Sequence, residues 1–227
     1  MIRGVDVLCH GFPGRACVGY LGWATVALVR TEDCLILYDT GAQAARPVLL
    51  DAFKNMFLKP EDIDIVVFSH SHFDHLGNVR LFKNARFMMS RAEWEYAFGN
   101  EDDICVELGA LEFLENKGIE LISEDGTEVV PGVKAILTPG HTPGSLSLLV
   151  KKAGETWALV GDAIKNRAEL ATELVDMTLN QKVSTESIAR VKGLAQRVLP
   201  GHDGWLRLTD EGVVAEERVN VRITLPA

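Results

Sequence analysis

Apolar residues lie along the chain in short runs that predict β-strands, and turn-forming residues separate each run from the next. The runs cover residues 5–9, 22–29, 34–38, 63–68, 86–89, 119–122, 128–130, 133–137, 146–150, 157–160 and 198–200. A polar turn joins the second and third runs, which predicts a β-hairpin. The later runs follow one another closely, as in an antiparallel meander.

Apolar residues spaced three or four positions apart predict four helices. These helices cover 47–57, 91–98, 104–116 and 184–197. Pro47 suits a first helical position, and Ser90 and Ser184 suit N-caps. The segment 163–183 is polar with scattered apolar residues, and its pattern assigns neither a helix nor a strand to it. No linker or low-complexity stretch interrupts the pattern, so a single domain over residues 1–227 is expected.

Composition narrows the classes of protein. The chain has 227 residues, 47% hydrophobic and 24% charged, which is ordinary for a globular protein that builds its own core. A net charge of −9, from 23 basic and 32 acidic residues, disfavours nucleic acid as a partner. No apolar run approaches the ~20 residues of a membrane-spanning helix. The four cysteines form no CxxC pair and residues 1–6 contain no apolar signal segment, so a cytoplasmic protein with reduced thiols is expected.

The densest chemistry lies in residues 69–78, SHSHFDHLGN, directly after the apolar run 63–68. His70, His72, Asp74 and His75 fall within six positions, although the whole chain has only six histidines. Neutral imidazoles and carboxylates are ligands that zinc, iron and manganese accept. The segment therefore predicts a metal site at the carboxyl end of a strand.

Three further strand ends each present one side chain that can bind a metal. His141 lies in LTPGHTPGS, Asp162 in WALVGDA and His202 in LPGHDG, and a glycine directly precedes each of them. Glycine lets the backbone turn tightly near an ion. Asp39, at the end of the run 34–38, is either a turn residue or a carboxylate that orients a metal-binding histidine.

Together the motifs HSHFDH, TPGHTPGS, VGDA and LPGHDG resemble the metallo-β-lactamase superfamily of hydrolases, in order and spacing, over nearly the whole chain. The resemblance implies a four-layer αββα sandwich, in which two mixed β-sheets pack face to face with helices outside. It also implies two divalent metal ions, zinc in the first place, with iron or manganese as alternatives. The implied ligands are His70, His72 and His141 for the first ion, Asp74, His75 and His202 for the second, and Asp162 as a bridge.

The implied reaction is hydrolysis of an ester, lactone or thioester in a small-molecule substrate by a hydroxide that the two metals share. Asp74 and Asp162 are then the catalytic carboxylates, and no separate leaving-group acid stands out. Three alternatives stay open: a mononuclear iron persulfide dioxygenase, a phosphodiesterase or ribonuclease of the same superfamily, and a non-catalytic metal-binding regulatory protein. A homodimer is also left open.

Departures from other branches narrow the resemblance. His72 stands where flavodiiron proteins have Glu, and Asp162 stands where one class of true β-lactamases has Cys, so neither activity is expected. The chain continues for only 25 residues after His202, too few for the helical domain of glyoxalase II. A compact lactonase-like or thioesterase-like hydrolase is the expectation.

The expected pocket lies among 10–22, Phe73, 163–183 and Trp205. Core packing is an equal alternative for the aromatic side chains Phe12, Tyr20, Phe73 and Trp205. His10 is expected to be a loop histidine. The acidic stretch 99–116 is expected to be a solvated surface element rather than a lid.

Overall fold

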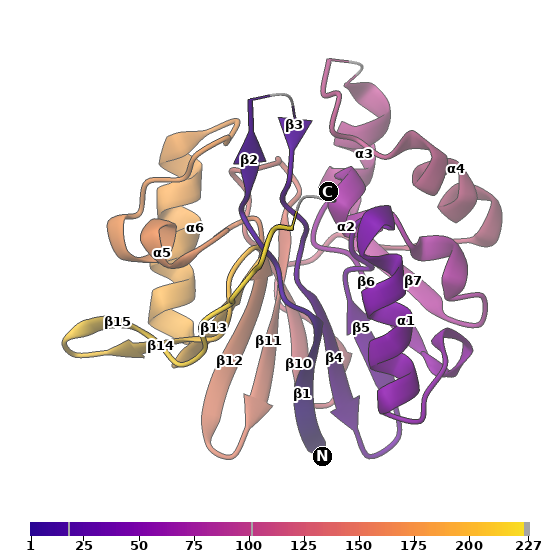
Figure 1. Ribbon diagram of the computed structural model, residues 1–227, viewed down its shortest axis with the longest axis horizontal. Coiled ribbons are helices and arrows are strands. Elements are labelled where there is room, and N and C mark those ends of the chain that lie inside the picture. The colour runs from indigo at the N-terminus through magenta and orange to yellow at the C-terminus, as the bar shows by residue number, and fades with distance from the viewer. Residues whose placement is uncertain (18, 101, 225–227) are drawn as a thin grey trace.

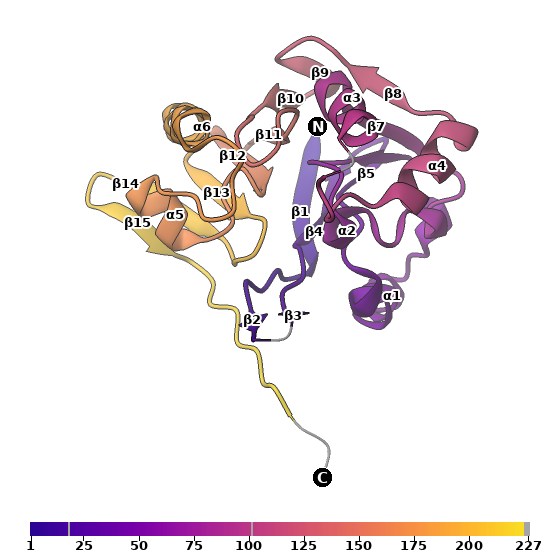
Figure 2. The ribbon, with the colours of Figure 1, turned by 90° about the horizontal axis from the view of Figure 1, so that it is seen from above.

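The chain folds into four layers, helices, sheet, sheet and helices, as Figures 1 and 2 show. The computed structural model describes residues 1–17, 19–100 and 102–224. Both sheets contain parallel and antiparallel pairs, so the predicted sandwich of two mixed sheets is confirmed. No helix in these described ranges has the length and apolar character that a bilayer crossing requires.

The first sheet has six strands in the order β1-β4-β5-β6-β7-β8. They are β1 (Ile2–Cys9), β4 (Val26–Thr31), β5 (Leu35–Tyr38), β6 (Ile65–Val67), β7 (Arg86–Ser90) and β8 (Glu120–Ile122). The predicted hairpin is present as the antiparallel pair β4 and β5. Its first strand begins at Val26 rather than Gly22, because Trp23 pairs with Phe12 and the Thr25 N–H donates to the Gly201 carbonyl.

The second sheet has seven strands in the order β15-β14-β13-β12-β11-β10-β9. They are β9 (Thr127–Val130), β10 (Val133–Leu137), β11 (Leu146–Lys152), β12 (Glu155–Gly161), β13 (Arg197–Pro200), β14 (Leu206–Thr209) and β15 (Gly212–Ala215). The meander from β9 to β12 is antiparallel as expected, while β12 and β13 run parallel. A separate short hairpin, β2 (Arg15–Ala16) with β3 (Gly19–Tyr20), projects beyond the sheets (Figure 1).

Alternation along the strands divides the buried side chains among three cores. Leu28 of β4 points to the helices outside the first sheet, and Val29 points to the opposite sheet. In β12, Leu159 faces the core between the sheets and Val160 faces the outer helices. Because successive side chains of a strand point to opposite faces, a sheet covered on both faces needs nearly continuous apolar runs. This explains why the strands read as unbroken apolar segments.

Helices cover the outer face of each sheet (Figure 2). The first sheet is covered by α1 (Arg46–Asn55), α3 (Arg91–Gly99) and α4 (Leu108–Lys117), and the second by α5 (Arg167–Thr172) and α6 (Gln181–Leu194). Phe53 and Leu111 pack into the first outer core, and Leu170 and Ile188 into the second. The short helix α2 (Phe73–Leu76) follows β6, and 3₁₀ turns lie at Gln43–Ala45, Pro60–Asp62 and Val79–Leu81.

The last two helices differ from the expectation. Helix α5 falls in the segment 163–183, to which the sequence pattern assigned no element, and the Asn166 side chain caps it by accepting from the N–H groups of Ala168 and Glu169. Helix α6 begins after Asn180, whose side chain accepts from the Val183 N–H, so the prediction of Ser184 as the cap was wrong.

Helix α4 also begins later than predicted, at Leu108 rather than Ile104. The residues before it make extended backbone bonds to the segment after β6. The Phe73 N–H donates to the Cys105 carbonyl, and the Glu107 N–H donates to the Ser71 carbonyl, each over 2.9 Å. Backbone groups used in this way are not available to a helix.

The first turn of α3 ties the two sheets together through Glu93, whose side chain is fully buried. Glu93 Oε1 accepts from the Ser71 N–H at 2.9 Å and the Ser71 hydroxyl at 2.7 Å. Its Oε2 accepts from the Thr142 hydroxyl at 2.6 Å and the Gly144 N–H at 3.2 Å. One carboxylate thus holds the loop after β6 against the loop after β10.

Replacing Glu93 with Ala is expected to lower the free energy of unfolding by on the order of 3 kcal/mol, because several buried donors lose their acceptor. Glu93→Gln keeps an amide oxygen and should cost less. Urea unfolding of the metal-free protein measures both. Glu95→Ala, on the exposed side of the same helix, is the control, and equal midpoints for Glu93→Ala and Glu95→Ala would refute the clamp.

Candidate metal centre

All seven residues predicted to bind metal meet at one edge of the sandwich. His70, His72, Asp74 and His75 follow β6, while His141, Asp162 and His202 follow β10, β12 and β13. Strands β10 and β12 both pair antiparallel with β11, and β13 runs parallel to β12, so the carboxyl ends of these three strands lie at the same edge. Ligands at the carboxyl ends of strands are the general arrangement of α/β sites.

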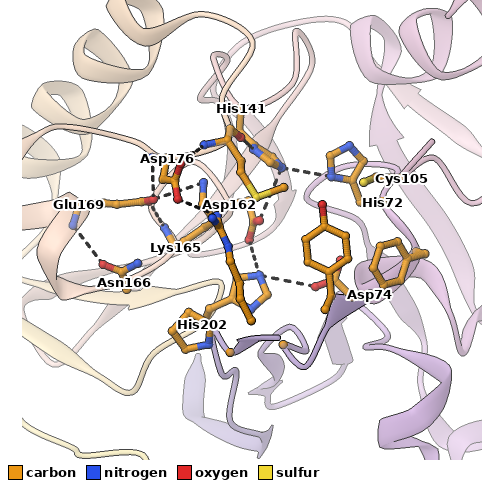
Figure 3. A pocket seen from close by; sticks show the side chains of 17 residues that line it. His72, Asp74, Cys105, His141, Asp162, Lys165, Asn166, Glu169, Asp176 and His202 are labelled. Carbon is orange, nitrogen blue, oxygen red and sulfur yellow. Dashed lines mark hydrogen bonds and ion pairs between the residues drawn. The ribbon is translucent and has the colours of Figure 1, made fainter. Parts of the chain in front are cut away.

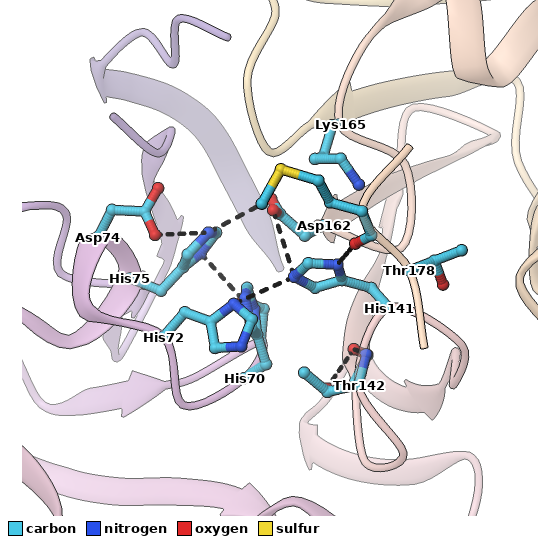
Figure 4. A network of polar contacts seen from close by, with 12 residues as sticks. His70, His72, Asp74, His75, His141, Thr142, Asp162, Lys165 and Thr178 are labelled. Carbon is cyan, nitrogen blue, oxygen red and sulfur yellow. Dashed lines mark hydrogen bonds and ion pairs between the residues drawn. The ribbon is translucent and has the colours of Figure 1, made fainter. Parts of the chain in front are cut away.

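The first group contains His70, His72 and His141, whose candidate ligand atoms lie within 4.8 Å of one another. His141 Nε2 lies 3.2 Å from His72 Nδ1. Figure 4 shows the three rings turned toward a common space. The composition of this group matches the first ligand set implied by the resemblance.

The second group contains Asp74, His75 and His202, again within 4.8 Å. Asp74 Oδ2 lies 3.5 Å from His202 Nε2, and Asp74 Oδ1 lies 3.8 Å from His75 Nε2. This group matches the second ligand set.

Asp162 lies between the two groups (Figures 3 and 4). Its Oδ2 is 3.5 Å from Nε2 of His141 in the first group. Its Oδ1 is 3.3 Å from Nε2 of His75 and 3.2 Å from Nε2 of His202 in the second group. Each oxygen therefore faces a different group, which is the geometry that a bridging carboxylate needs.

A glycine is required beside Asp162. A Cβ built on Gly201 would lie 2.2 Å from Asp162 Oδ1. Gly161 has a φ of +49°, and a Cβ built on it would lie 2.5 Å from Ser69 Cβ. Glycine therefore permits the close approach of the backbone at both positions.

Four of the five histidines are held from behind through Nδ1, which leaves Nε2 facing the centre. Nδ1–H of His141 donates to the Met177 carbonyl at 2.8 Å, and Nδ1–H of His202 donates to the Trp23 carbonyl at 2.9 Å. Nδ1 of His70 lies 2.9 Å from the Ser69 hydroxyl. A carbonyl accepts only from N–H, so these contacts set the tautomer of His141 and His202.

Asp39 orients the fourth of these histidines, His75, through a hydrogen bond to its ring. Its Oδ2 accepts from Nδ1–H of His75 at 2.8 Å, and its Oδ1 accepts from the Ser69 N–H at 2.7 Å. Of the two roles considered for Asp39, orientation of a histidine is the one that the geometry supports. His10, in contrast, lies outside the cluster and pairs with Glu217 at 3.3 Å.

The donor set fits a cation. Among the described residues, His70 Nε2, His75 Nε2 and Asp162 Oδ1 are buried side-chain atoms without a hydrogen-bond partner. Buried polar atoms are rarely left unpaired, because losing water without a replacement bond costs free energy. Nitrogen and carboxylate oxygen donors that converge in this way suit zinc, iron or manganese.

Burial and neighbouring charges shift the pKa values of four of the histidines, downward in two and upward in the other two. Burial, together with the adjacent imidazoles, holds the pKa of His70 well below its usual range, and burial lowers the pKa of His141 to about 3. Both rings are therefore neutral at pH 7, with a lone pair available. Burial opposes protonation of His75 and His202 too, but nearby carboxylates outweigh it and raise the pKa of each. Burial likewise opposes ionisation of Asp162, yet the charges of His202 and His75 outweigh it, so the pKa of Asp162 is lowered.

A cavity of about 180 Å³ opens onto the centre. Its walls include Tyr20 and Phe73, as expected for two of the four aromatic candidates. The other two pack elsewhere: the Phe12 ring lies tilted against Trp23, and Trp205 lies against Trp157 in the core between the sheets. Of the two alternatives for Trp205, core packing is the one observed, because its side chain packs in the core between the sheets.

Several polar residues around the centre were not singled out in the sequence. Lys165 and Glu169 line the cavity with their charged groups 3.3 Å apart (Figure 3). Across its mouth, Arg15 of β2 forms an ion pair with Asp176 at 2.6 Å. Lys165 lies three positions after Asp162 in VGDAIK, and that proximity was the only available signal.

Comparison with known proteins agrees with the fold. The family model for the metallo-beta-lactamase superfamily matches residues 22–208. A protein from Methanocaldococcus jannaschii named as a probable metallo-hydrolase is 30% identical over 74% of this chain and 71% of its own. An N-acyl homoserine lactonase from Bacillus cereus is 32% identical over 68% of this chain and 62% of its own, so the chain spans less than two thirds of that relative.

Solved structures show the same architecture. A variant of AiiA from B. thuringiensis, with N-decanoyl-L-homoserine bound at its active site, has a TM-score of 0.66 and 25% identity, covering 79% of this chain and 80% of that chain. A probable metal-dependent hydrolase from Staphylococcus aureus has a TM-score of 0.74 at 21% identity, covering 89% of this chain and 83% of that chain, which concerns the fold alone. The fold and the histidine–aspartate cluster define a protein of the metal-dependent hydrolase class. The chain belongs to the metallo-beta-lactamase superfamily.

Asp39→Asn is expected to weaken binding of a metal at the second group by about 10–100-fold. The new amide would donate to Nδ1 of His75, so the ring proton would move to Nε2 and block the lone pair. Asn tolerates the positive φ of 61° at this position, which limits other effects. Stepwise metal titration against a chelator measures the change, with exposed Asp33→Asn as control. Unchanged affinity for both metals in Asp39→Asn would contradict this role.

Proposed function

We propose that the protein is a dinuclear metal-dependent hydrolase that cleaves an ester, lactone or thioester bond in a small molecule. The observation that carries the proposal is Asp162, whose two carboxylate oxygens face two separate groups of ligand atoms. A single metal ion would occupy only one of the two groups. At the other group, Asp74, His75 and His202 would then face one another with no cation between them. Buried polar clusters of that kind are costly unless they are satisfied.

The relatives support the class of substrate. Several N-acyl homoserine lactonases are 30–32% identical to this chain, and the AiiA structure holds N-decanoyl-L-homoserine at its active site. A lactone is a cyclic ester, so the same attack on a carbonyl carbon opens it. We therefore place lactones first among the candidate substrates.

The chain's own residues would divide the work. His70, His72 and His141 would hold one cation, and Asp74, His75 and His202 the other. Two divalent cations bound there would supply an activated water and polarise the substrate carbonyl. Asp162 would offset the repulsion between the two cations, and Asp74, which lines the cavity, would hold the proton of the attacking water.

Lys165 would bind the carboxylate group that hydrolysis of the substrate forms. Its Nζ is buried at the cavity wall and has no hydrogen-bond partner among the described residues, although Glu169 Oε1 lies 3.3 Å away. Ester or lactone hydrolysis produces a carboxylate, and an ammonium group donates strong charge-assisted hydrogen bonds to it. Tyr20 and Phe73, whose rings are 6.2 Å apart, would contact the apolar part.

Lys165→Met should weaken inhibition by the carboxylate product by on the order of tenfold, because one charge-assisted hydrogen bond is lost. Methionine keeps the length and apolar stem of the side chain. The inhibition constant of the product, measured for a substrate that the wild type turns over, reports the change. Lys182→Met, on the exposed face of α6, should leave the constant unaltered, and an equal constant in Lys165→Met would remove Lys165 from product binding.

The central test combines metal analysis with a substrate panel. After loading with zinc or manganese, the wild type should hold two metal ions per chain. It should also hydrolyse at least one lactone, ester or thioester, and the release of acid measures this reaction. Asp162→Ala should lose nearly all activity and bind at most one ion tightly, while exposed Asp210→Ala should match the wild type. Thermal unfolding of each metal-free variant checks that the protein is folded.

Two results would contradict the proposal. One is less than one metal per chain with no turnover of any substrate. The other is iron bound at the first group alone with oxygen uptake on glutathione persulfide, which would identify the dioxygenase alternative.

A further inference from the structure

His72 is oriented differently from the other four histidines. Its Nδ1 faces His141 Nε2 at 3.2 Å, and its Nε2 points away from the centre. That outer nitrogen lies 3.0 Å from Asp103 Oδ2, and the two side chains are 12% and 16% exposed. A histidine can bind a metal through either nitrogen, so the hydrogen bond on one nitrogen decides which of them is free.

Asp103 is itself held firmly. The Tyr96 hydroxyl donates to its Oδ2 at 2.7 Å, and the Cys105 N–H donates to its Oδ1 at 3.0 Å. Tyr96 belongs to α3, so the carboxylate is anchored to a helix that packs on the first sheet. These bonds fix the carboxylate so that its Oδ2 faces Nε2 of His72.

The segment that carries Asp103 is also attached to the metal loop by its backbone. His72 and Val106 form an antiparallel bridge. On either side of it, the Phe73 N–H donates to the Cys105 carbonyl, and the Glu107 N–H donates to the Ser71 carbonyl. The segment therefore runs alongside Ser71, His72 and Phe73, with the candidate ligand His72 in the middle.

We propose that Asp103 is the positioning residue that makes His72 bind metal through Nδ1, so that residues 103–107 form part of the surroundings of the first metal group. The inference rests on the proposed function, because it assumes that a metal binds there. Asp103 is not itself a ligand, since it lies on the outer side of the ring. Without it, the His72 ring is free to rotate and to expose Nε2 to the pocket.

The test compares Asp103→Ala, Asp103→Asn and Tyr96→Phe with a matched control, Asp102→Ala. Asp102 is exposed and adjacent, so the control removes the same charge without touching His72. Metal affinities are measured by chelator competition, the coordination of the first ion by the visible spectrum of the cobalt(II) protein, and folding by thermal unfolding of the metal-free protein.

Asp103→Ala should weaken binding at the first group by about 10–100-fold and change the cobalt spectrum, with the affinity of the second group close to wild type. Asp103→Asn should also weaken this binding, because its single amide oxygen cannot accept from both the Cys105 N–H and Nε2–H of His72. Tyr96→Phe should cause a smaller loss, since Asp103 keeps its other bonds. Asp102→Ala should match the wild type in every measurement.

Wild-type affinity and spectrum in both Asp103 variants would overturn the inference while leaving the proposed function intact. Equal weakening of both metal groups together with a less stable metal-free protein would also overturn it, because that pattern indicates a general structural role. If the wild type binds no metal, the proposed function fails.

Discussion

Five imidazoles and two carboxylates are brought together at the edge where the two sheets meet. Burying so many polar groups costs free energy unless each one is paired, and the rest of the structure supplies the partners. The inner nitrogens and oxygens are left for a cation, and the protein satisfies the outer ones. Asp39, Ser69, Asp103 and the carbonyls of Met177 and Trp23 each hold one or more rings from behind. These partners come from both sheets, so the centre can form only when the sandwich has closed.

Glu93 makes the closure specific. Its carboxylate bonds the loop of the first sheet that carries His70 and His72 to the loop of the second sheet that carries His141. The two sheets could slide on an apolar core alone, since such packing is non-directional. A buried carboxylate with four donors has only one arrangement that satisfies it, and that arrangement sets the distance between the two loops.

The sequence predicted the seven candidate ligands because each stands at a visible place, in HSHFDH or after an apolar run. It predicted the sandwich through the resemblance that those motifs carry. Asp103 could not be found in this way, because a carboxylate in an acidic loop looks like solvated surface and only folding brings it to His72. Helix α5, with Glu169, was missed because six residues are too few for a clear helical period. Ser184 looked like a cap because nothing local distinguishes it from Asn180, which lies one helical turn earlier.

The proposed dinuclear centre depends most on Asp162 lying between two metal ions. Anomalous diffraction from crystals of the zinc- or manganese-loaded protein tests this directly. We expect two peaks about 3.5–4 Å apart, one beside His70, His72 and His141 and the other beside Asp74, His75 and His202, each in contact with one oxygen of Asp162. A single peak at full loading, or two peaks of which one does not touch Asp162, would contradict the proposed dinuclear centre.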